Sequence, residues 1–396
     1  MGLSMALVRT TYHVESDMPL EKAAKEIAAE QSTGTWTDVP AEREVHEKLG
    51  ARVVSAKDDV VVIDFPEEIF EPDNVPQILS VVAGNLFGLG GLKACKLLDV
   101  DFDPITKYYS GPEFGIEDVR KMLGAYDRPL VGTIIKPKVG LSPRRTAEVA
   151  EQAALGGLDL IKDDETLTDQ RFCPLEERLA AVMDKLNRVE DRTGKRTLYA
   201  VNVTCGADQI VERAELAVDL GANTVMVDIL TAGFSAVQAL TDVKVGVPIH
   251  IHRTMHGALT RGPFGIAMPV IAKLTRMCGG TNLHVGTYAG KMERNVAEID
   301  ASRDVLREPW DRFKRVWPVA SGGLYPQKVR ANLDNYGVDC ILQAGGGIHG
   351  HPDGTTAGVR AMFQAVEAWK EHKTLEEYAK AHKELAAALK QWGPSQ

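Results

Sequence analysis

The sequence predicts an α/β protein in which a (β/α)8 barrel follows a smaller α+β domain. From Arg128 onward, short apolar runs alternate eight times with stretches of helical periodicity. Strands that alternate with helices indicate parallel βαβ units, and eight such units favour a closed barrel. Before residue 125, β-rich runs and helical runs occur with a hairpin among them. We therefore expect an α+β domain over residues 1–124, and the barrel with its C-terminal helices over residues 125–396.

The N-terminal part contains four predicted elements. Leu7–Glu15 has the composition of a strand, and Pro19–Ala29, rich in Ala, Glu and Lys, that of a helix. Two Val-rich runs within Ala51–Phe65 are separated by a charged turn at residues 57–59, which is typical of a β-hairpin. Val75–Gly84 begins as a helix and ends in a turn of small residues.

The barrel is predicted from eight apolar runs and the helices between them. The predicted strands are Leu130–Ile135, Leu158–Ile161, Leu198–Val203, Thr224–Ile229, Val247–Ile251, Asn282–Val285, Val316–Ala320 and Cys340–Gln343. The predicted helices include Pro143–Ala154, Leu175–Arg188, Ile210–Leu220, Phe264–Cys278 and Pro326–Asn335, with terminal helices in Thr356–Trp392. An open doubly wound sheet is the alternative, but no GxGxxG motif follows the first strand to support a dinucleotide site.

Composition excludes several classes of partner. The net charge is −9 and the pI about 5.7, so no excess of cations is present to neutralise phosphates, and we expect neither nucleic acid nor a membrane as partner. Five widely spaced cysteines form no CxxC pair, which favours reduced thiols. No stretch reaches the ~18 apolar residues of a membrane span, and the N-terminus has no signal pattern. We expect a cytoplasmic protein.

A charged cluster, Lys162-Asp163-Asp164-Glu165, follows the second predicted strand. Barrel enzymes carry their chemistry at the C-terminal ends of the strands, and Mg²⁺ prefers a few carboxylates together with water and substrate oxygens. If the strand continues, alternation places Lys162 and Asp164 on one face and Asp163 on the other. The cluster therefore indicates a cation site, the alternative being a solvated loop of charges.

Glycine runs follow the last two predicted strands, as Ser321-Gly322-Gly323 and Gly345-Gly346-Gly347. Backbone N–H groups approach an anion closely where no Cβ intervenes, and a phosphate site between these two loops recurs in barrel enzymes. Lys291 lies in a Gly-flanked loop of the kind that closes over substrates. The runs indicate a phosphate site, the alternative being tight turns alone.

Polar residues also end the first, third and fourth predicted strands. Lys136 and Lys138 flank a proline after the first. They either pair with a substrate phosphate or include a lysine whose pKa is lowered until it acts as a base. The third and fourth runs end at Asn202 and Asp228.

The fifth run ends at His252-Arg253, and the sixth carries His284. An arginine in this place fits bidentate recognition of a phosphate. His250 has the same strand parity as His252, and parity alone leaves open which of the two is buried.

These segments resemble the large subunit of ribulose-1,5-bisphosphate carboxylase/oxygenase (RuBisCO) over nearly the whole chain. The motifs are GTIIKPKVGLS (Gly132–Ser142), GGLDLIKDDE (Gly156–Glu165), HRTMH (His252–His256), LHVGTYAGKME (Leu283–Glu293), SGG (Ser321–Gly323), GGGIHGHPDG (Gly345–Gly354), EQSTGTWT (Glu30–Thr37) and AGNLFG (Ala83–Gly88). The segment GPEFGIEDVRKMLGAYDRPL is most similar to the archaeal form III branch.

The resemblance implies Mg²⁺-dependent carboxylation, and oxygenation, of ribulose 1,5-bisphosphate through an enediolate to 3-phosphoglycerate. It implies that Lys162 reacts with CO₂ to form a carbamate, which holds one Mg²⁺ per site together with Asp164 and Glu165. The carbamate is then the base for enolisation. Lys136 transfers protons and protonates the final carbanion, and His252 takes part in acid–base steps.

The resemblance also implies how the substrate is held. Lys138 supports the charge of the metal site, and Lys291 closes over the substrate and stabilises the carboxylated intermediate. The implied substrate contacts, besides Lys138, are Arg253, His284 and Ser321 at one phosphate, Thr35, Trp36, Lys291, Gly323, Gly345 and Gly346 at the other, and Gly322 and Gln343. Glu30 and Asn85 come from a second subunit, which implies a homodimer or an oligomer of dimers without a small subunit. The form III branch suggests a role in salvage of nucleotide-derived ribose.

One position departs from the family pattern. After Lys291 the family usually has glycine where this chain has Arg294. The alternative function is therefore a RuBisCO-like isomerase or decarboxylase that acts through an enolate on another phosphorylated sugar. The complete set of main site residues favours the carboxylase.

Overall fold

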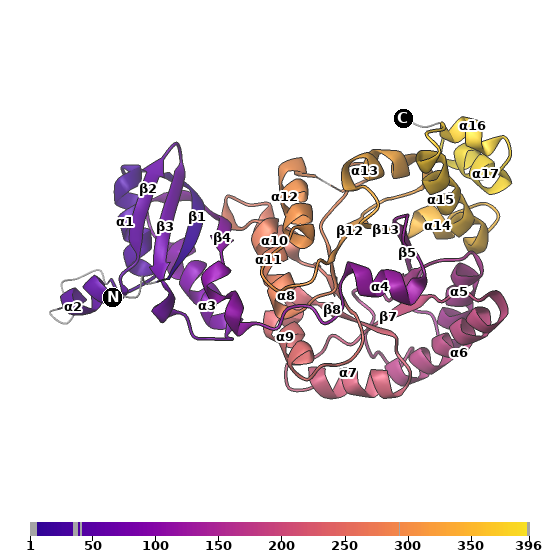
Figure 1. Ribbon diagram of the computed structural model, residues 1–396, viewed down its shortest axis with the longest axis horizontal. Coiled ribbons are helices and arrows are strands. Elements are labelled where there is room, and N and C mark those ends of the chain that lie inside the picture. The colour runs from indigo at the N-terminus through magenta and orange to yellow at the C-terminus, as the bar shows by residue number, and fades with distance from the viewer. Residues whose placement is uncertain (1–5, 35–38, 40–41, 293, 394–396) are drawn as a thin grey trace.

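The computed structural model describes residues 6–34, 39, 42–292 and 294–393. Its N-terminal part is a sheet with the strand order β10-β4-β1-β3-β2 (Figure 1). β1 (Leu7–Ser16) is central and pairs antiparallel with β3 (Val60–Pro66) and β4 (Leu92–Asp101), while β2 (Arg52–Lys57) extends β3. Alternate residues of β1 are buried, as expected for a strand with one face on a core. The predicted strand, helix and hairpin are confirmed here, and β4 is an addition.

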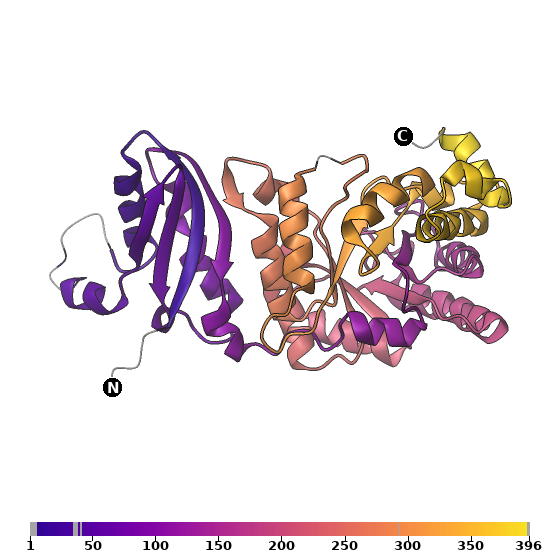
Figure 2. The same cartoon turned by 45° about the horizontal axis from the view of Figure 1, so that its top comes forward.

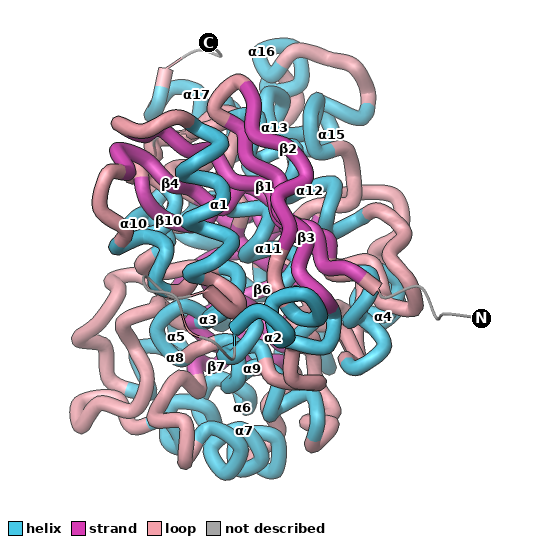
Figure 3. Tube along the Cα trace, turned by 90° about the vertical axis from the view of Figure 1, so that its left-hand side faces the viewer, coloured by secondary structure: helices cyan, strands magenta, loops and turns pink. Residues whose placement is uncertain are grey.

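Helices cover this sheet. α1 (Leu20–Glu30) buries Ala23, Ala24, Ile27 and Ala28, whose spacing gives the helix one apolar stripe. It lies on the face of the sheet remote from the barrel (Figures 1 and 3). The other helical elements of this part are α2 (Glu42–Leu49), η1 (Glu67–Ile69), α3 (Val75–Val82), η2 (Asn85–Gly88) and η3 (Asp103–Tyr108).

The C-terminal part is a closed parallel barrel, formed entirely by described residues, which confirms the predicted fold. Its strands, in order, are β5 (Leu130–Ile134), β6 (Leu160–Lys162), β7 (Leu198–Asn202), β8 (Thr224–Asp228), β9 (Ile249–His252), β11 (Asn282–His284), β12 (Trp317–Ser321) and β13 (Ile341–Gln343). The helices of this part are α5 (Pro143–Leu155), α6 (Leu175–Thr193), α7 (Ile210–Asp219), α8 (Ile229–Ala232), α9 (Phe234–Asp242), α10 (His256–Thr260), α11 (Met268–Cys278), α12 (Val296–Arg307), η4 (Pro326–Lys328), α13 (Val329–Tyr336), α14 (Gly346–His349), α15 (Thr355–Lys370), α16 (Leu375–Ala379) and α17 (Lys383–Trp392). Within the described chain, no helix is both long and apolar enough to span a bilayer.

One predicted helix is wrong at its start. The sequence predicts a helix over Phe264–Cys278, but Phe264–Ile266 forms strand β10, and α11 begins only at Met268. Gly265 has φ +141°, which a helix does not accept, and Pro269 favours a helix that starts beside it. β10 pairs in parallel with β4, so a segment from the barrel part completes the N-terminal sheet.

The two parts contact each other through the helices that follow β10. Figure 2 shows the sheet beside α11 and α12. Lys273 of α11 donates to Asp99 and to the carbonyl of Val100 at 2.7 Å each, and Lys96 of β4 forms a 3.1 Å ion pair with Glu298 of α12. The sheet is therefore fixed to the side of the barrel, leaving the C-terminal strand ends to the loops.

The opposite end of the barrel is closed by α4 (Ile116–Leu123). Ile116 and Val119 pack with Leu130 and Trp317 in an apolar cluster at the start of the strands, and Arg120 lies over the Trp317 ring at 4.8 Å. Only the C-terminal end is left for a site, as the barrel prediction requires. α4 packs on the barrel although it lies before residue 125 in the sequence. The domain boundary at residues 124 and 125 stays a prediction.

His349, the last residue of α14, provides a pH-dependent contact between α14 and β5. Its Nε2 lies 2.9 Å from the carbonyl oxygen of Ile134, and its Nδ1 lies 3.0 Å from the Thr355 hydroxyl. Burial, against the hydrogen bond to Ile134, lowers the pKa of His349 to about 4. Between pH 6.5, the ordinary pKa of histidine, and pH 4, the unfolded chain therefore binds more protons at His349 than the folded protein does. The stabilisation of the folded state by neutral His349 is present above about pH 6.5 and is lost as the pH falls toward 4.

We expect His349→Gln, which keeps a donor for Ile134 but does not titrate, to flatten this dependence. Between pH 7 and pH 4 the wild type is expected to lose up to about 3 kcal/mol more of its free energy of unfolding than the variant. Urea unfolding at a series of pH values measures this difference. Parallel pH profiles for the two proteins would contradict the assignment.

Candidate active site

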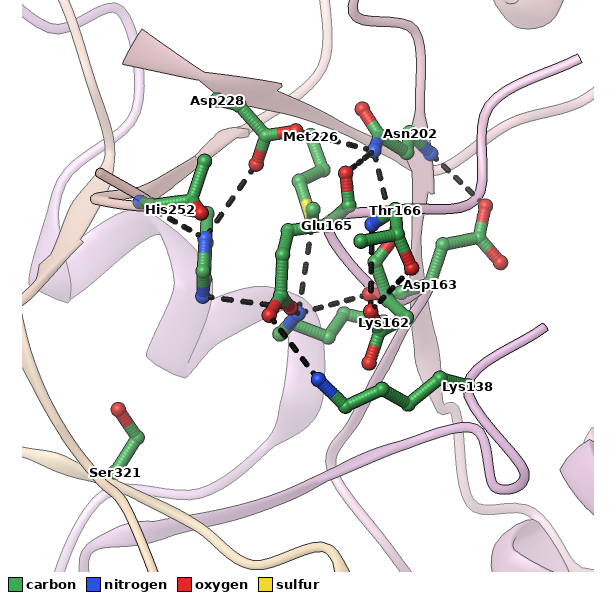
Figure 4. A network of polar contacts seen from close by, with 12 residues as sticks. Lys138, Lys162, Asp163, Glu165, Thr166, Asn202, Met226, Asp228, His252 and Ser321 are labelled. Atoms are coloured by element: carbon green, nitrogen blue, oxygen red, sulfur yellow. Dashed lines mark hydrogen bonds and ion pairs between the residues drawn. The ribbon is translucent and has the colours of Figure 1, made fainter. Parts of the chain in front are cut away.

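Strand β6 brings the charged cluster to the mouth of the barrel. Lys162 is the last residue of the strand and is only 1% exposed. Its Nζ donates to the carbonyl oxygen of Asp163 at 2.8 Å and lies 3.7 Å from Glu165 Oε2 (Figure 4). Burial, which outweighs the nearby carboxylates, lowers the pKa of the Lys162 ammonium. The amine is thus held beside a carboxylate in a place that favours its uncharged, nucleophilic form.

Asp163 points away from this cluster, as strand parity predicts. Its Oδ2 accepts from Arg178 and from the backbone N–H of Asn202, at 3.2 and 2.9 Å, and its Oδ1 accepts from the Tyr199 hydroxyl at 2.5 Å. Asp163 and Arg178 are both fully buried. This carboxylate therefore fixes β6 to β7 and α6, and the candidate cation site retains Asp164 and Glu165.

Within the described chain, three lysines converge on these two carboxylates. Lys136 Nζ lies 3.1 Å from Asp164 Oδ2, and Lys138 Nζ lies 3.7 Å from Glu165 Oε1, opposite Lys162. Although burial raises it, the pKa of Asp164 is lowered overall by the Thr166 hydroxyl and Lys136. The pKa of Glu165 is likewise lowered by His252 and Lys162, against burial. Both carboxylates are therefore anions, and Lys136 and Lys138 supply the opposing charge.

The donor set of the same cluster does not by itself form a complete metal site. The described residues include no group of three or more His, Cys, Asp or Glu side chains placed to hold a metal ion. Asp164 and Glu165 provide two anionic ligands, and Lys162 lies where a third would be needed. The site fits a hard divalent cation only once the Lys162 amine carries an oxygen ligand.

His252 joins this cluster from β9. Its Nε2 lies 3.7 Å from Glu165 Oε2, and its Nδ1 lies 3.4 Å from Asp228 Oδ1 (Figure 4). The backbone N–H of Thr254 donates to Nδ1 at 3.1 Å, which leaves the proton of the neutral ring on Nε2. Burial and the Lys162 charge outweigh the two carboxylates and lower the pKa of His252. His252 is thus a neutral imidazole that faces the carboxylates.

Asp228 and Asn202 belong to the site, although the sequence analysis gave them no role. Asn202 Nδ2 lies 3.4 Å from Asp228 Oδ2 and within reach of the carbonyl oxygens of Asp164 and Glu165. They support the loop after β6 from the neighbouring strand ends. The signal was present in the sequence, since each is the last polar residue of a predicted barrel strand.

A cavity of about 200 Å³ is lined by Arg253, the residue after His252, and by His256, Lys96, Arg294 and Glu298, among others. Arg253 forms no ion pair with any described carboxylate, and burial lowers its pKa to about 10. An unpaired guanidinium that is largely removed from water is the expected partner of an anionic ligand. The predicted Arg253 therefore lines a pocket in which Lys96 and Arg294 add positive charge and Glu298 adds one carboxylate.

His284 and Ser321 lie next to this pocket, on neighbouring strands. His284 Nδ1 lies 2.7 Å from Ser321 Oγ, and the His284 ring contacts the His252 ring edge-to-face at 4.7 Å. The predicted Arg253, His284 and Ser321 thus surround one end of the barrel mouth.

The glycine loops follow β12 and β13 at the same mouth. The backbone N–H of Lys291 donates to the carbonyl of Gly322 at 2.9 Å, and a Cβ at Gly323 would come within 2.7 Å of Lys291 Cγ. The Lys291 side chain is exposed at this rim. Gly345 follows β13, with its Cα beside the Lys136 side chain, and Gly346 begins α14. The predicted glycines therefore line the mouth between Lys136 and Lys291.

Gln343 is buried at the end of β13, and neither atom of its amide group has a hydrogen-bond partner among the described residues. A Cβ at Gly132 would lie 2.1 Å from Gln343 Oε1, so glycine leaves room for the amide in this position. Gln343 is therefore a polar group inside the barrel, below the glycine loops.

Among the described residues, the predicted Glu30 and Asn85 are not brought to this mouth. Thr35 and Trp36 lie outside the described residues. Glu30 and Asn85 contact each other, with 3.3 Å between Asn85 Nδ2 and Glu30 Oε1. Glu30 ends α1, on the face of the sheet remote from the barrel of the same chain (Figure 3). Within one chain this pair does not contact the residues of the barrel site.

Comparisons with known proteins identify the family of this sequence. The sequence matches the family description "Ribulose bisphosphate carboxylase large chain, catalytic domain" over residues 115–392 and the corresponding N-terminal domain over residues 7–105. It is 43% identical over 399 residues to a ribulose bisphosphate carboxylase of Methanocaldococcus jannaschii, covering 94% of each chain.

Solved structures are similar over the same range. The octameric RuBisCO of Pyrococcus horikoshii, in complex with sulfate, has a TM-score of 0.92 at 37% identity and is matched over 99% of this chain and 94% of that one. A dimeric archaeal RuBisCO from Hyperthermus butylicus has a TM-score of 0.91 at 38% identity, over 99% of this chain and 97% of that one.

Proposed function

This chain belongs to the ribulose bisphosphate carboxylase large-chain family, and from that premise we propose that it carboxylates ribulose 1,5-bisphosphate in a Mg²⁺-dependent reaction that yields 3-phosphoglycerate. Oxygenation would compete at the same enediolate, and the enzyme would be a lyase. The observation that carries the proposal is the convergence of Lys136, Lys138 and Lys162 on Asp164 and Glu165. A structural role for the cluster gives no reason to bury an amine beside two carboxylates.

The first step proposed is activation of Lys162. Its uncharged Nζ attacks the carbon of CO₂, a C–N bond forms, and one proton leaves the nitrogen, which gives an anionic carbamate. The lowered pKa of Lys162 supports this step, because only the uncharged amine is a nucleophile. The carbamate oxygen, Asp164 and Glu165 would then hold Mg²⁺. When bound, this ion would polarise the substrate oxygens and stabilise the enediolate.

Other residues of the chain would then handle protons and charge. The carbamate would remove the C3 proton of the substrate. Lys136, held 3.1 Å from Asp164, would return a proton to the final carbanion, and the neutral His252 is placed for acid–base exchange beside Glu165. Lys138 would balance the charge of Glu165, and Lys291 would close over the substrate from its exposed rim position.

The two ends of the substrate would occupy the two sides of the mouth. Arg253, His284 and Ser321 would bind one phosphate, which is supported by an Arg253 guanidinium that has no ion-pair partner among the described residues. Lys291, Gly322, Gly323, Gly345 and Gly346 would bind the other, together with Thr35 and Trp36. Gln343 would contact the substrate from below.

We also propose that the working form is a homodimer or an oligomer of dimers, without a small subunit. The support is the place of Glu30 and Asn85, which pair on a surface that their own barrel does not reach. In a dimer this surface would complete the mouth of the second barrel. Salvage of nucleotide-derived ribose is the pathway we propose, and a cytoplasmic location is consistent with it.

A mixing experiment tests the shared site. Each proposed site takes Lys162 from one subunit and Glu30 from the other. Glu30→Gln and Lys162→Met would therefore each give an inactive homodimer, because each change alters both of its sites. Heterodimers formed by co-expression would contain one unaltered site, so about one quarter of wild-type activity is expected from random assortment. A mixed preparation of heterodimers with no activity would contradict a site shared in this way.

A second candidate is a RuBisCO-like isomerase or decarboxylase acting through an enolate on another phosphorylated sugar. The observation that favours it is Arg294, which adds a guanidinium to the pocket of Arg253. Incubation with labelled CO₂, Mg²⁺ and ribulose 1,5-bisphosphate distinguishes the two. Acid-stable label in 3-phosphoglycerate is expected, and its absence after activation with CO₂ and Mg²⁺ would refute the carboxylase.

A further inference from the structure

A line of three hydrogen-bonding side chains runs through the interior of the barrel to the mouth. His250 on β9, His284 on β11 and Ser321 on β12 come from consecutive strands of the barrel. His250 Nε2 lies 2.9 Å from His284 Nε2, and His284 Nδ1 lies 2.7 Å from Ser321 Oγ. His250 is fully buried and His284 is 2% exposed, so solvent does not compete for these contacts.

The number of protons in this line is limited. Two ring nitrogens at 2.9 Å share one proton, since two bare nitrogens would repel and two N–H groups would clash. Burial also lowers the pKa of His250 and of His284 well below the ordinary value, so each ring is neutral and carries one proton. The line therefore has only two arrangements, which differ in the direction in which every hydrogen bond points.

The far end of the line decides between them. His250 Nδ1 is buried and has no hydrogen-bond partner among the described residues. If His284 donated to His250, the proton of His250 would lie on Nδ1 as a buried donor without an acceptor. Buried N–H groups without an acceptor are rarer in native proteins than buried acceptors without a donor. The favoured arrangement therefore has a bare Nδ1 and the His250 proton on Nε2.

The direction then follows along the line. His250 Nε2–H donates to His284 Nε2, so the His284 proton lies on Nδ1 and is donated to Ser321 Oγ. The Ser321 hydroxyl, with its oxygen already accepting, directs its own hydrogen outward. In the opposite arrangement that hydrogen would be used by His284, and Ser321 would present only lone pairs to the mouth, which an anion would not accept.

We propose that His250 is a positioning residue that sets the direction of the His250–His284–Ser321 line, so that Ser321 presents a donor to an anionic group of the substrate. Only the identity of that group as a phosphate rests on the proposed function. The direction of the line is a property of the protein without substrate.

The direct test is the position of the ring protons. In protein labelled with ¹⁵N-histidine and deuterated, NMR correlations separate protonated from bare ring nitrogens, and the signals are assigned by their loss in His284→Gln and His250→Gln. We expect a protonated Nδ1 in His284 and a protonated Nε2 in His250. A bare Nδ1 in His284 would overturn the proposal. Because no turnover is needed, this result is independent of whether the protein carboxylates ribulose bisphosphate.

A matched pair of variants tests the consequence. His250→Gln keeps an amide donor for His284 Nε2, whereas His250→Leu of similar size removes it. With inorganic phosphate as the probe in calorimetry, we expect binding about tenfold weaker for the leucine variant, as loss of one hydrogen bond predicts. The glutamine variant is expected to stay within about twofold of the wild type.

If the proposal holds, the weaker phosphate binding of His250→Leu depends on the Ser321 hydroxyl. In a Ser321→Ala background, in which Arg253 still binds phosphate, His250→Leu is expected to add no further weakening. Equal weakening by leucine and glutamine, or a full effect of leucine in the Ser321→Ala background, would show a merely structural role and overturn the proposal. A wild-type protein that binds phosphate with these dependences but incorporates no CO₂ would refute the proposed carboxylation alone.

Discussion

Lys162→Met is expected to abolish carboxylation while leaving the protein folded and no less stable. The loss of activity should exceed about a hundredfold. Mutation of a residue that only supports a metal ligand typically costs up to about that much, and Lys162 would itself carry a ligand. Methionine fills a similar volume without a charge to desolvate, so the free energy of unfolding should be unchanged or rise by up to about 2 kcal/mol. Labelled-CO₂ incorporation and urea unfolding measure the two effects.

The stability difference should depend on pH in a defined direction. Because burial lowers the pKa of Lys162 in the folded protein, the unfolded chain binds the additional proton between the folded value and the ordinary value of 10.5. Wild-type stability therefore rises with pH through that window, and the advantage of Lys162→Met shrinks.

Lys185→Met serves as the matched control for this experiment. Lys185 lies on α6 in a partly exposed 3.0 Å ion pair with Glu151, remote from the cluster. Its replacement should leave CO₂ incorporation unchanged. Wild-type activity in Lys162→Met, or an equal loss in Lys185→Met, would contradict the role given to Lys162.

Arg178→Met is expected to cause the largest loss of stability, about 3–5 kcal/mol. Arg178 and Asp163 are fully buried with 3.1 Å between Nη2 and Oδ2, so removal of the guanidinium leaves a carboxylate without its charge partner. Arg178 also donates to the carbonyl oxygens of Cys173 and Thr168, which would lose their donors. The urea midpoint at fixed protein concentration measures the change.

Two comparisons isolate the buried charge. Arg188→Met removes an arginine from the same helix, but its pair with Asp184 is largely exposed and should contribute less than about 1 kcal/mol. Adding Asp163→Asn to Arg178→Met removes the stranded charge and should restore part of the stability. If the double variant were as unstable as the sum of its single changes, the uncompensated carboxylate would not be the cause.

The sequence predicted the parts of the site that depend on strand periodicity. Closure of eight parallel strands brings all their C-terminal ends to one mouth, so residues that follow different strands, such as Lys136, Lys162 and His252, had to lie near one another. The two-residue period also separated Asp163 from Lys162 and Asp164. These inferences need only local patterns and one rule of topology.

Other features depended on packing between distant segments. The sequence did not predict β4, and it assigned β10 to a helix, because β10 is a strand only where the edge of β4 pairs with it. Parity could not distinguish His250 from His252, since both face the barrel interior. The position along the strand determines which of the two is buried: His250 is fully buried, and His252 lies at the mouth.

The sequence by itself thus determined the barrel, the family resemblance and most of the side chains at the mouth, because these follow from periodicities and motifs within short segments. Only the tertiary structure decided that Asp228 and Asn202 support the site, that Arg253 has no ion pair with a carboxylate of the described residues, and that His250, His284 and Ser321 form one line. Those facts are distances between atoms on different strands, and they are fixed only when the barrel closes.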